Sequence, residues 1–237
     1  MEWREYLLEF GGALGFVLAY AVLFLLAKQL NDLLSPYKLI EELAVKDNPA
    51  VGIALTGYLL ASALVFVGPL LGPTGDYLTD LLSVAGYALL GLVFINISRW
   101  VLDKFIFHHF CNWEALIDDQ NVGMGAVRFG VYVATGLVAA GSVNGNGGGV
   151  ITALVFFVLG QGALLLFTRI YDLTTSYKLH EEIEKGNVAA GVAFGGTVLA
   201  LGIIIGKAAS GSFVSWEDNL IDFVSTTLTG IIVLQVV

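Results

Sequence analysis

The sequence predicts an all-α, polytopic transmembrane helical bundle built from parallel repeats of a two-helix hairpin. The first observation behind this prediction is composition. Apolar residues make up 57% of the 237 residues and charged residues only 13%, with a mean hydropathy of +0.83, far outside the range of soluble domains. The second observation is that one pattern, an asparagine followed by glycines at fixed offsets, occurs three times within apolar segments.

In each repeat a glycine lies four and nine residues after the asparagine. The three sets are Asn48 with Gly52 and Gly57, Asn121 with Gly125 and Gly130, and Asn187 with Gly191 and Gly196. Further small residues follow at close to helical spacing, which places them along one face of a helix. Small side chains let membrane helices pack closely where lipid offers no hydrophobic drive for association. We therefore expect helix packing at these glycines, either within one chain or between copies in a homo-oligomer.

Seven membrane helices are expected in the sequence. Helices one, three and five are uncharged over 10–27, 81–98 and 150–168, and 18 residues nearly cross a hydrocarbon core of roughly 30 Å. Helices two, four and six follow the asparagines, and helix seven begins near Asp222. Because helix seven is still apolar at Val237, we expect the natural chain to continue into an eighth helix. This gives two four-helix units, 8–143 and an incomplete 150–237.

The basic residues predict the orientation of the helices. They lie mostly beside the segments that join odd helices to even ones, namely Lys28, Lys38, Lys46, Arg99, Lys104, Arg169, Lys178 and Lys185. By the positive-inside rule these segments are cytoplasmic and the N-terminus is outside. The expected location is the bacterial inner (plasma) membrane, with the lipid bilayer as the main partner. A net charge of −9 argues against nucleic acid.

Two polar segments nearly copy each other: residues 37–42 read Tyr-Lys-Leu-Ile-Glu-Glu and residues 177–182 read Tyr-Lys-Leu-His-Glu-Glu. With these segments and its asparagine-led helix starts, the chain resembles the YjfL-like family of bacterial inner-membrane proteins, domain of unknown function 350. The resemblance implies four transmembrane helices per unit and two tandem units. It also implies a connection with polyamines or envelope stress, because family members are found beside genes for polyamine aminopropyltransferases and phage-shock-type proteins. It brings no catalytic residue and no cofactor.

A few polar residues interrupt the apolar helices. Arg128 lies seven residues into helix four, about 10 Å from its start. Such an arginine either lines a substrate path or has a structural role, snorkelling to the interface or pairing with Asp103 or Glu114. Asn96 and Gln161 are lone amides in apolar runs. They are candidates for the same path, and interhelical hydrogen bonds are the alternative.

Three carboxylates occupy matching positions at the outer starts of helices one, three and seven: Glu9, Asp80 and Asp222. A ring of carboxylates at an outer mouth would concentrate cations, including polyamines. The alternative is ordinary helix chemistry, because acidic residues are favoured at helix N-termini.

The sequence gives little sign of catalysis. His108, His109 and Cys111 are close together, but their spacing matches no closed zinc site, so no metal site is predicted. Phosphate-binding, dinucleotide-binding, hydrolase and metalloprotease motifs are missing from the sequence. We therefore expect a protein that is not an enzyme and needs no cofactor.

Two functions fit these observations. The first is an integral inner-membrane channel, transporter or sensor for small cations or polyamines. The second is a non-conducting scaffold or anchor that recruits a peripheral membrane protein during envelope stress. Its candidate contact residues lie in the duplicated segments: Leu39, Glu41, Glu42, Leu179, Glu181 and Glu182. The same segments could instead lie flat on the membrane as interfacial helices.

Overall fold

The computed structural model describes residues 3–72, 75–105, 113–145 and 147–236, and in these ranges the regular elements are helices. Seven of them are long: α1 (Trp3–Leu34), α2 (Pro49–Leu70), α3 (Tyr77–Phe105), α5 (Val122–Ser142), α6 (Gly149–Thr174), α8 (Val188–Ala209) and α9 (Trp216–Val236). Three are short: the π-helix η1 (Glu41–Val45), α4 (Trp113–Ile117) and α7 (Leu179–Glu184). The predicted all-α architecture is confirmed.

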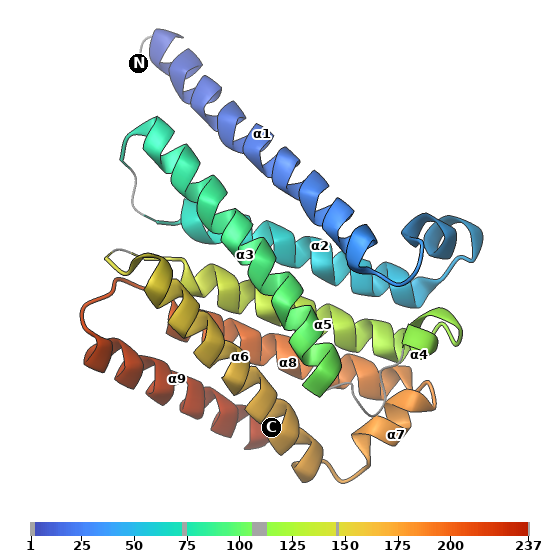
Figure 1. The fold of residues 1–237 in the computed structure, drawn as a ribbon. Coiled ribbons are helices and arrows are strands. Elements are labelled where there is room, and N and C mark those ends of the chain that lie inside the picture. The colour runs from blue at the N-terminus through green and yellow to red at the C-terminus, as the bar shows by residue number, and fades with distance from the viewer. Residues whose placement is uncertain (1–2, 73–74, 106–112, 146, 237) are drawn as a thin grey trace.

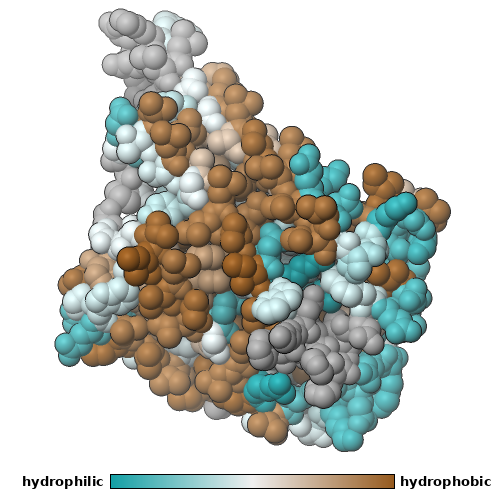
Figure 2. Space-filling model, in the orientation of Figure 1, coloured by the Kyte–Doolittle hydropathy of each residue, from teal (hydrophilic) through white to brown (hydrophobic). Residues whose placement is uncertain are grey.

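Six helices of the described part are long and apolar enough to cross a membrane. These spans are Phe10–Leu34, Pro49–Leu70, Tyr77–Val101, Val122–Ser142, Gly149–Thr174 and Val188–Ala209. Large apolar side chains such as Leu18 and Val158 are 65% and 64% exposed, as expected for groups that face lipid. Apolar residues cover most of the visible face, whereas hydrophilic residues gather at the end with the short helices (Figure 2). The protein is therefore a multi-pass membrane protein.

The helices form two layers (Figure 1). Helices α2, α5 and α8 lie side by side, with α5 in contact with both neighbours. Helices α3 and α6 cross this layer and contact α5, while α1 packs on α2 and α3, and α9 packs on α6 and α8. Helix α5 is thus the centre of the bundle, and 83% of its most apolar stretch is buried.

The asparagines begin α2, α5 and α8, and we call this end of the bundle the asparagine end. Each side-chain oxygen accepts a hydrogen bond from a backbone N–H of the first helical turn: Asn48 from Ala50 and Val51, Asn121 from Met124, and Asn187 from Ala190. This is N-capping. The residue before each asparagine has a positive φ: 50° at Asp47, 48° at Gln120 and 81° at Gly186. The repeat is therefore present in the backbone as well as in the sequence.

Helix α9 begins at Trp216, earlier than the start near Asp222 that the sequence suggested. The Ser215 hydroxyl oxygen accepts a hydrogen bond from the backbone N–H of Asp218 at 3.1 Å. Glu217 and Asp218 therefore lie in the first turn, where negative charge is favourable. A start near Asp222 would have left Glu217 and Asp218 in the preceding loop, but both belong to the helix.

Four of the six expected packing glycines lie where two helix backbones meet. A Cβ atom on Gly57 would lie 2.6 Å from Cα of Phe129, and one on Gly125 would lie 2.6 Å from the Ala50 carbonyl oxygen. A Cβ atom on Gly130 or Gly191 would meet the backbone of the facing helix just as closely. Helices α2, α5 and α8 can lie this close only because these positions carry no side chain.

The other two glycines do not pack against a neighbouring helix among the described residues. A Cβ atom on Gly52 would make an ordinary 3.6 Å contact with Leu43, and one on Gly196 would meet nothing within 4 Å. Close helix packing is therefore not observed at these two positions within the described part of the chain. The physical reason is that Gly52 and Gly196 lie on the outer faces of the α2–α5–α8 layer.

We expect Asn121→Ala to destabilise the protein more than Asn187→Ala. Both changes remove an N-cap, which costs about 1 kcal/mol. Asn121 is 5% exposed, and its Nδ2 also donates to the Ile183 carbonyl oxygen of α7 at 2.6 Å; leaving that buried acceptor unpaired adds about 1 kcal/mol or more. Equilibrium unfolding in mixed micelles measures both variants, and equal losses would contradict this account.

Candidate functional site

Two arginines are buried near the asparagine end, one from α3 and one from α5. Arg99 is 5% exposed and Arg128 is 2% exposed. Their Cζ atoms lie 4.9 Å and 4.3 Å from the centroid of the Trp113 ring, which α4 supplies. A guanidinium over an aromatic ring is attracted by the ring's negative face. The indole of Trp113 therefore helps to hold both charges inside the bundle.

The partners of Arg99 in the described part are neutral. Its Nη1 donates to Asn31 Oδ1 at 3.0 Å and its Nη2 donates to Ser35 Oγ at 3.1 Å, both at the end of α1. No carboxylate of the described residues lies within salt-bridge distance of Arg99. Among the described residues, neutral groups therefore solvate this buried charge.

The Arg128 side chain is almost completely buried, and its guanidinium lies against Trp113 of α4, which is outside the candidate membrane spans. Of the two acidic partners expected from the sequence, Glu114 is exposed on α4 and the side chain of Asp103 lies outside the described residues.

Tyr37, in the connection between α1 and η1, also packs against Trp113. Its ring lies 5.6 Å from that of Trp113. Burial, and then the proximity of Tyr132, raises the pKa of Tyr37 above its usual value, although a hydrogen bond with Ser35 and the two guanidinium charges oppose the rise. The Tyr37 hydroxyl is therefore neutral at physiological pH and can donate or accept a hydrogen bond.

Asn96 and Tyr58 extend the polar region towards the middle of the bundle. Asn96 Nδ2 donates to Tyr58 Oη at 3.1 Å and to the Leu92 carbonyl oxygen at 2.8 Å. The Tyr58 ring also meets Tyr132 edge-on, with centroids 5.7 Å apart. We call the whole set the buried polar cluster; it consists of five buried residues, Asn31, Tyr58, Arg99, Arg128 and Tyr132, and four half-buried ones, Ser35, Tyr37, Asn96 and Trp113.

A pocket of about 320 Å³ opens at the opposite end of the same group of helices. We call it the Asp80 pocket; its lining includes Phe16, Asp80, Ser83, Val84, Tyr87 and Val143. Asp80 Oδ2 accepts a hydrogen bond from the Gly75 N–H at 2.8 Å, so the carboxylate also shapes the turn before α3. Along α3, the buried residues Ala88 and Leu92 separate this pocket from Asn96.

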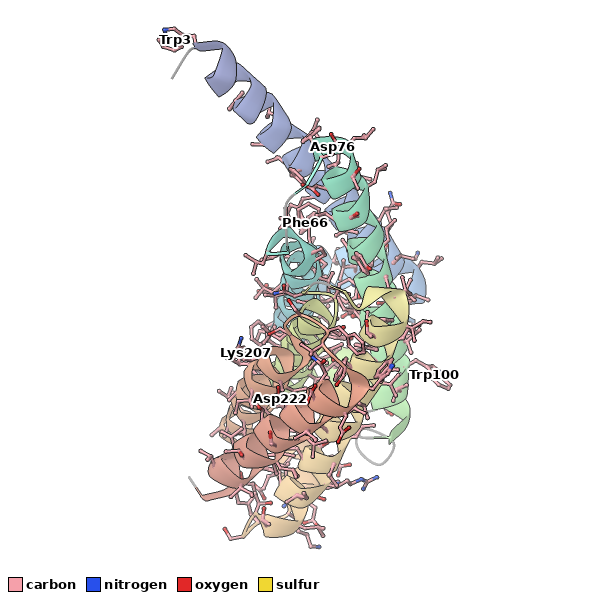
Figure 3. The ribbon with its side chains drawn as sticks, turned by 90° about the vertical axis from the view of Figure 1, so that its left-hand side faces the viewer. Trp3, Phe66, Asp76, Trp100, Lys207 and Asp222 are labelled. Atoms are coloured by element: carbon pink, nitrogen blue, oxygen red, sulfur yellow. The ribbon has the colours of Figure 1, made fainter. Side chains whose placement is uncertain are left out.

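The predicted ring of carboxylates is not formed by Asp80 and Asp222. Asp222 is exposed on α9, does not line the Asp80 pocket, and lies well away from Asp76 at the start of α3 (Figure 3). Helix α6 runs between α3 and α9 (Figure 1). The side chain of Glu9 lies outside the described residues.

Gln161 does not join the buried polar cluster. It lies on α6, is 9% exposed, and neither of its side-chain polar atoms has a hydrogen-bond partner in the described part of the chain. The expected interhelical hydrogen bond is therefore not observed. His108, His109 and Cys111 lie outside the described residues, and the described residues contain no group of three or more His, Cys, Asp or Glu that could hold a metal ion.

The candidate partner-binding residues are divided between the core and the surface. Leu39 and Leu179 are 4% and 2% exposed and pack in the core, so their prediction as partner contacts is wrong. Glu42 is also buried, and it accepts hydrogen bonds from Lys46 at 2.7 Å and Asn48 at 3.1 Å. Burial opposes its ionisation, but these hydrogen bonds and the Lys46 charge outweigh burial and lower the pKa of Glu42. The remaining candidates are at least partly exposed: Glu41, Glu181 and Glu182.

Comparison with known proteins gives one family and one partial relative. The sequence model described as Domain of Unknown Function (DUF350) matches residues 5–143 and again residues 146–237. A curated relative, the UPF0719 transmembrane protein YshE of Bacillus subtilis (strain 168), is 30% identical over 73 residues. That match covers 31% of this chain and 51% of the relative, so about half of the relative's length is spanned. No solved structure matches the chain.

Proposed function

The chain belongs to the DUF350 family, and because the function of that family is unknown, we propose from the geometry that the protein conducts or transports a small cation across the bacterial inner membrane. The path lies in the first unit, among α1, α2, α3 and α5. The observation that carries the proposal is that these helices hold a pocket with a carboxylate at one end and the buried polar cluster at the other.

Burying polar groups in a membrane costs free energy. Arginine, asparagine and tyrosine side chains inside a bilayer are expensive and mark functional paths by default. Asn96, Tyr58 and Arg99 come from segments that the sequence presents as membrane-spanning. Simple packing would be served by apolar residues at these positions, so the cluster favours a functional role.

The Asp80 pocket supplies the features that a cation needs on entry. Its carboxylate attracts positive charge, and clefts lined by one sign of charge raise the local concentration of the opposite ion. Ser83 and Tyr87 add hydroxyl oxygens to the same lining. A pocket of about 320 Å³ has room for a hydrated inorganic cation or part of a polyamine.

The structure corresponds, in this proposal, to a closed state. Buried apolar residues separate the pocket from the cluster, and the positive charge of Arg99 opposes a cation that has passed them. Charged side chains of this kind exclude cations from membrane pores. The rival function, a non-conducting scaffold, is less favoured because Leu39 and Leu179 are buried and unavailable to a partner.

Cation flux through proteoliposomes tests the proposal. Asp80→Asn should lower the uptake of potassium, sodium or spermidine on the order of tenfold at low ionic strength, because the attractive charge at the entrance is lost. Asp222→Asn is the matched control: it removes an acidic residue from α9, outside the pocket, and should leave uptake unchanged. Absence of flux in vesicles that hold folded protein, or equal effects of the two changes, would refute the proposed path.

A further inference from the structure

A second pocket lies beside the Asp80 pocket, at the end of the bundle opposite the asparagine end. It has a volume of about 70 Å³ and forms where the connection between α5 and α6 meets the connection between α8 and α9 (Figure 1). Its described lining carries no charged side chain and includes Ser142, Gly149, Thr152, Phe156, Ser210 and Phe213. We call it the Thr152 pocket. It is next to the Asp80 pocket, because Tyr87, Val143 and Gly145 line both.

The Thr152 pocket is the Asp80 pocket of the next repeat. Each pocket is lined by the residues that lie 22 and 24 positions after two successive asparagines. These residues are Leu70, Gly72, Val143 and Gly145 in the Asp80 pocket, and Val143, Gly145, Ala209 and Gly211 in the Thr152 pocket. The ends of two neighbouring helices of the α2–α5–α8 layer therefore form the same part of the wall in both pockets.

The helices that cross this layer also contribute equivalent residues, but with a different charge. The matching sets are Asp80, Ser83 and Tyr87 on α3, and Gly149, Thr152 and Phe156 on α6, which have the same spacing. Thr152 thus replaces the hydroxyl of Ser83, whereas Gly149 stands where Asp80 has its carboxylate. The second repeat keeps the pocket and its hydroxyl but not the negative charge.

Three hydroxyl groups of the Thr152 pocket can only accept hydrogen bonds from a ligand. Each already donates its proton to a backbone carbonyl oxygen at 2.8 Å: Ser142 to Ala139, Thr152 to Gly149, and Ser210 to Lys207. A hydroxyl has one proton and two lone pairs, so the lone pairs are what remains for a bound molecule. Such oxygens favour a cation and offer nothing to an anion.

Two further features of the lining favour positive charge. Helices α5 and α8 both end at this pocket, and the C-terminus of a helix carries partial negative charge. The rings of Phe156 and Phe213 can attract a cation through their faces. The N-terminus of α6 borders the pocket and has the opposite sign, which limits the strength of binding. Lys207 is exposed and lines a different groove, with Leu64 and Ile203.

We propose that the Thr152 pocket binds a monovalent cation, potassium or ammonium, through neutral oxygen atoms. Divalent cations such as calcium and magnesium are usually held by carboxylates, and the described lining has none. Neutral oxygens replace the water around a weakly hydrated ion such as potassium, and about 70 Å³ is enough for such an ion with few of its waters. This site is distinct from the Asp80 pocket and does not depend on conduction through the first unit.

Stabilisation of the protein by potassium tests the site without measuring flux. A ligand that binds only the folded state raises its stability, so unfolding in mixed micelles is followed in potassium chloride and in N-methyl-D-glucamine chloride at equal ionic strength. We expect stabilisation by potassium or ammonium, with the stronger of the two identifying the ligand, and weaker stabilisation by sodium. Equal stability of the wild type in all four salts would overturn the proposal.

Two threonine variants place the ion. Thr152→Val removes an oxygen from the lining and should weaken potassium binding roughly tenfold, as the loss of one contact to a charged group does. Thr168→Val is the matched control, because Thr168 is also buried on α6 and donates to the Leu164 carbonyl oxygen at 2.8 Å; it should keep the potassium effect. Asp80→Asn should keep it as well. Equal losses in the two threonine variants, or loss in Asp80→Asn, would overturn the proposal.

Restoring the missing carboxylate gives a test by gain of affinity. Gly149 has a φ of 75°, and a Cβ atom there would meet nothing within 4 Å. Aspartate and asparagine are among the residues that tolerate positive φ, so Gly149→Asp and Gly149→Asn carry the same backbone strain and differ in charge. Gly149→Asp should bind potassium roughly tenfold more tightly than Gly149→Asn, measured by the same stabilisation. Equal binding by the two variants would show that the ion lies elsewhere.

Discussion

Gly130→Leu should cost the protein most of its stability, whereas Gly162→Leu should leave it nearly unchanged. A Cβ atom on Gly130 would lie 2.7 Å from Cα of Gly195 and closer still to its carbonyl group. These are backbone atoms of α8 and cannot rotate away. Overpacking a core typically costs 1–3 kcal/mol, and here a whole helix must move, so we expect a loss of about 3 kcal/mol or more.

The control, Gly162→Leu, makes the same substitution at a glycine that does not meet a neighbouring helix among the described residues. A Cβ atom on Gly162 would meet nothing within 4 Å, and leucine is a better helix former than glycine by roughly 1 kcal/mol. Unfolding by sodium dodecyl sulfate in mixed micelles measures both variants. Gly57→Leu should behave like Gly130→Leu, because its Cβ would meet the Phe129 backbone. Wild-type stability of Gly130→Leu would show that α5 and α8 are not packed this closely.

The helix-packing part of the fold is predictable because its signals are local and periodic. An asparagine caps the helix that follows it, and glycines at helical spacing identify the face that carries them. The sequence cannot say which helix lies against that face. Gly52 and Gly196 have the same offsets as Gly125 and Gly130, yet among the described residues only the latter two meet the backbone of a neighbouring helix.

The candidate site is less predictable because it depends on contacts between distant segments. Arg128 is visible in the sequence as a charge inside an apolar run. Arg99 ends such a run, where the positive-inside rule predicts an interfacial residue. Its burial depends on Trp113, which α4 places beneath it. In the sequence, Leu39 and Leu179 are compatible with a surface role as well as with a buried one. Both are buried because the segments of η1 and α7 pack against the bundle.

The closed state that we propose predicts that Arg99→Gln increases cation flux roughly thirtyfold. At roughly 8 Å and an effective dielectric constant of about 20, one positive charge opposes a monovalent cation by about 2 kcal/mol, which corresponds to that factor in rate. Glutamine removes the charge and keeps an amide that can hydrogen-bond to Asn31 and Ser35. The bundle should therefore stay folded while the electrostatic barrier to the passing cation decreases.

Two further variants separate the effect of charge from that of structure. Arg99→Lys keeps the positive charge and should leave flux close to the wild-type rate. Arg169 ends the apolar run of α6 as Arg99 ends that of α3, but it is exposed, so Arg169→Gln should not increase flux. If Arg99→Lys leaks as much as Arg99→Gln, packing and not charge closes the path. If neither leaks while Asp80→Asn still lowers uptake, the cation does not pass Arg99, and the path must leave the cluster on its α2 side, near Tyr58.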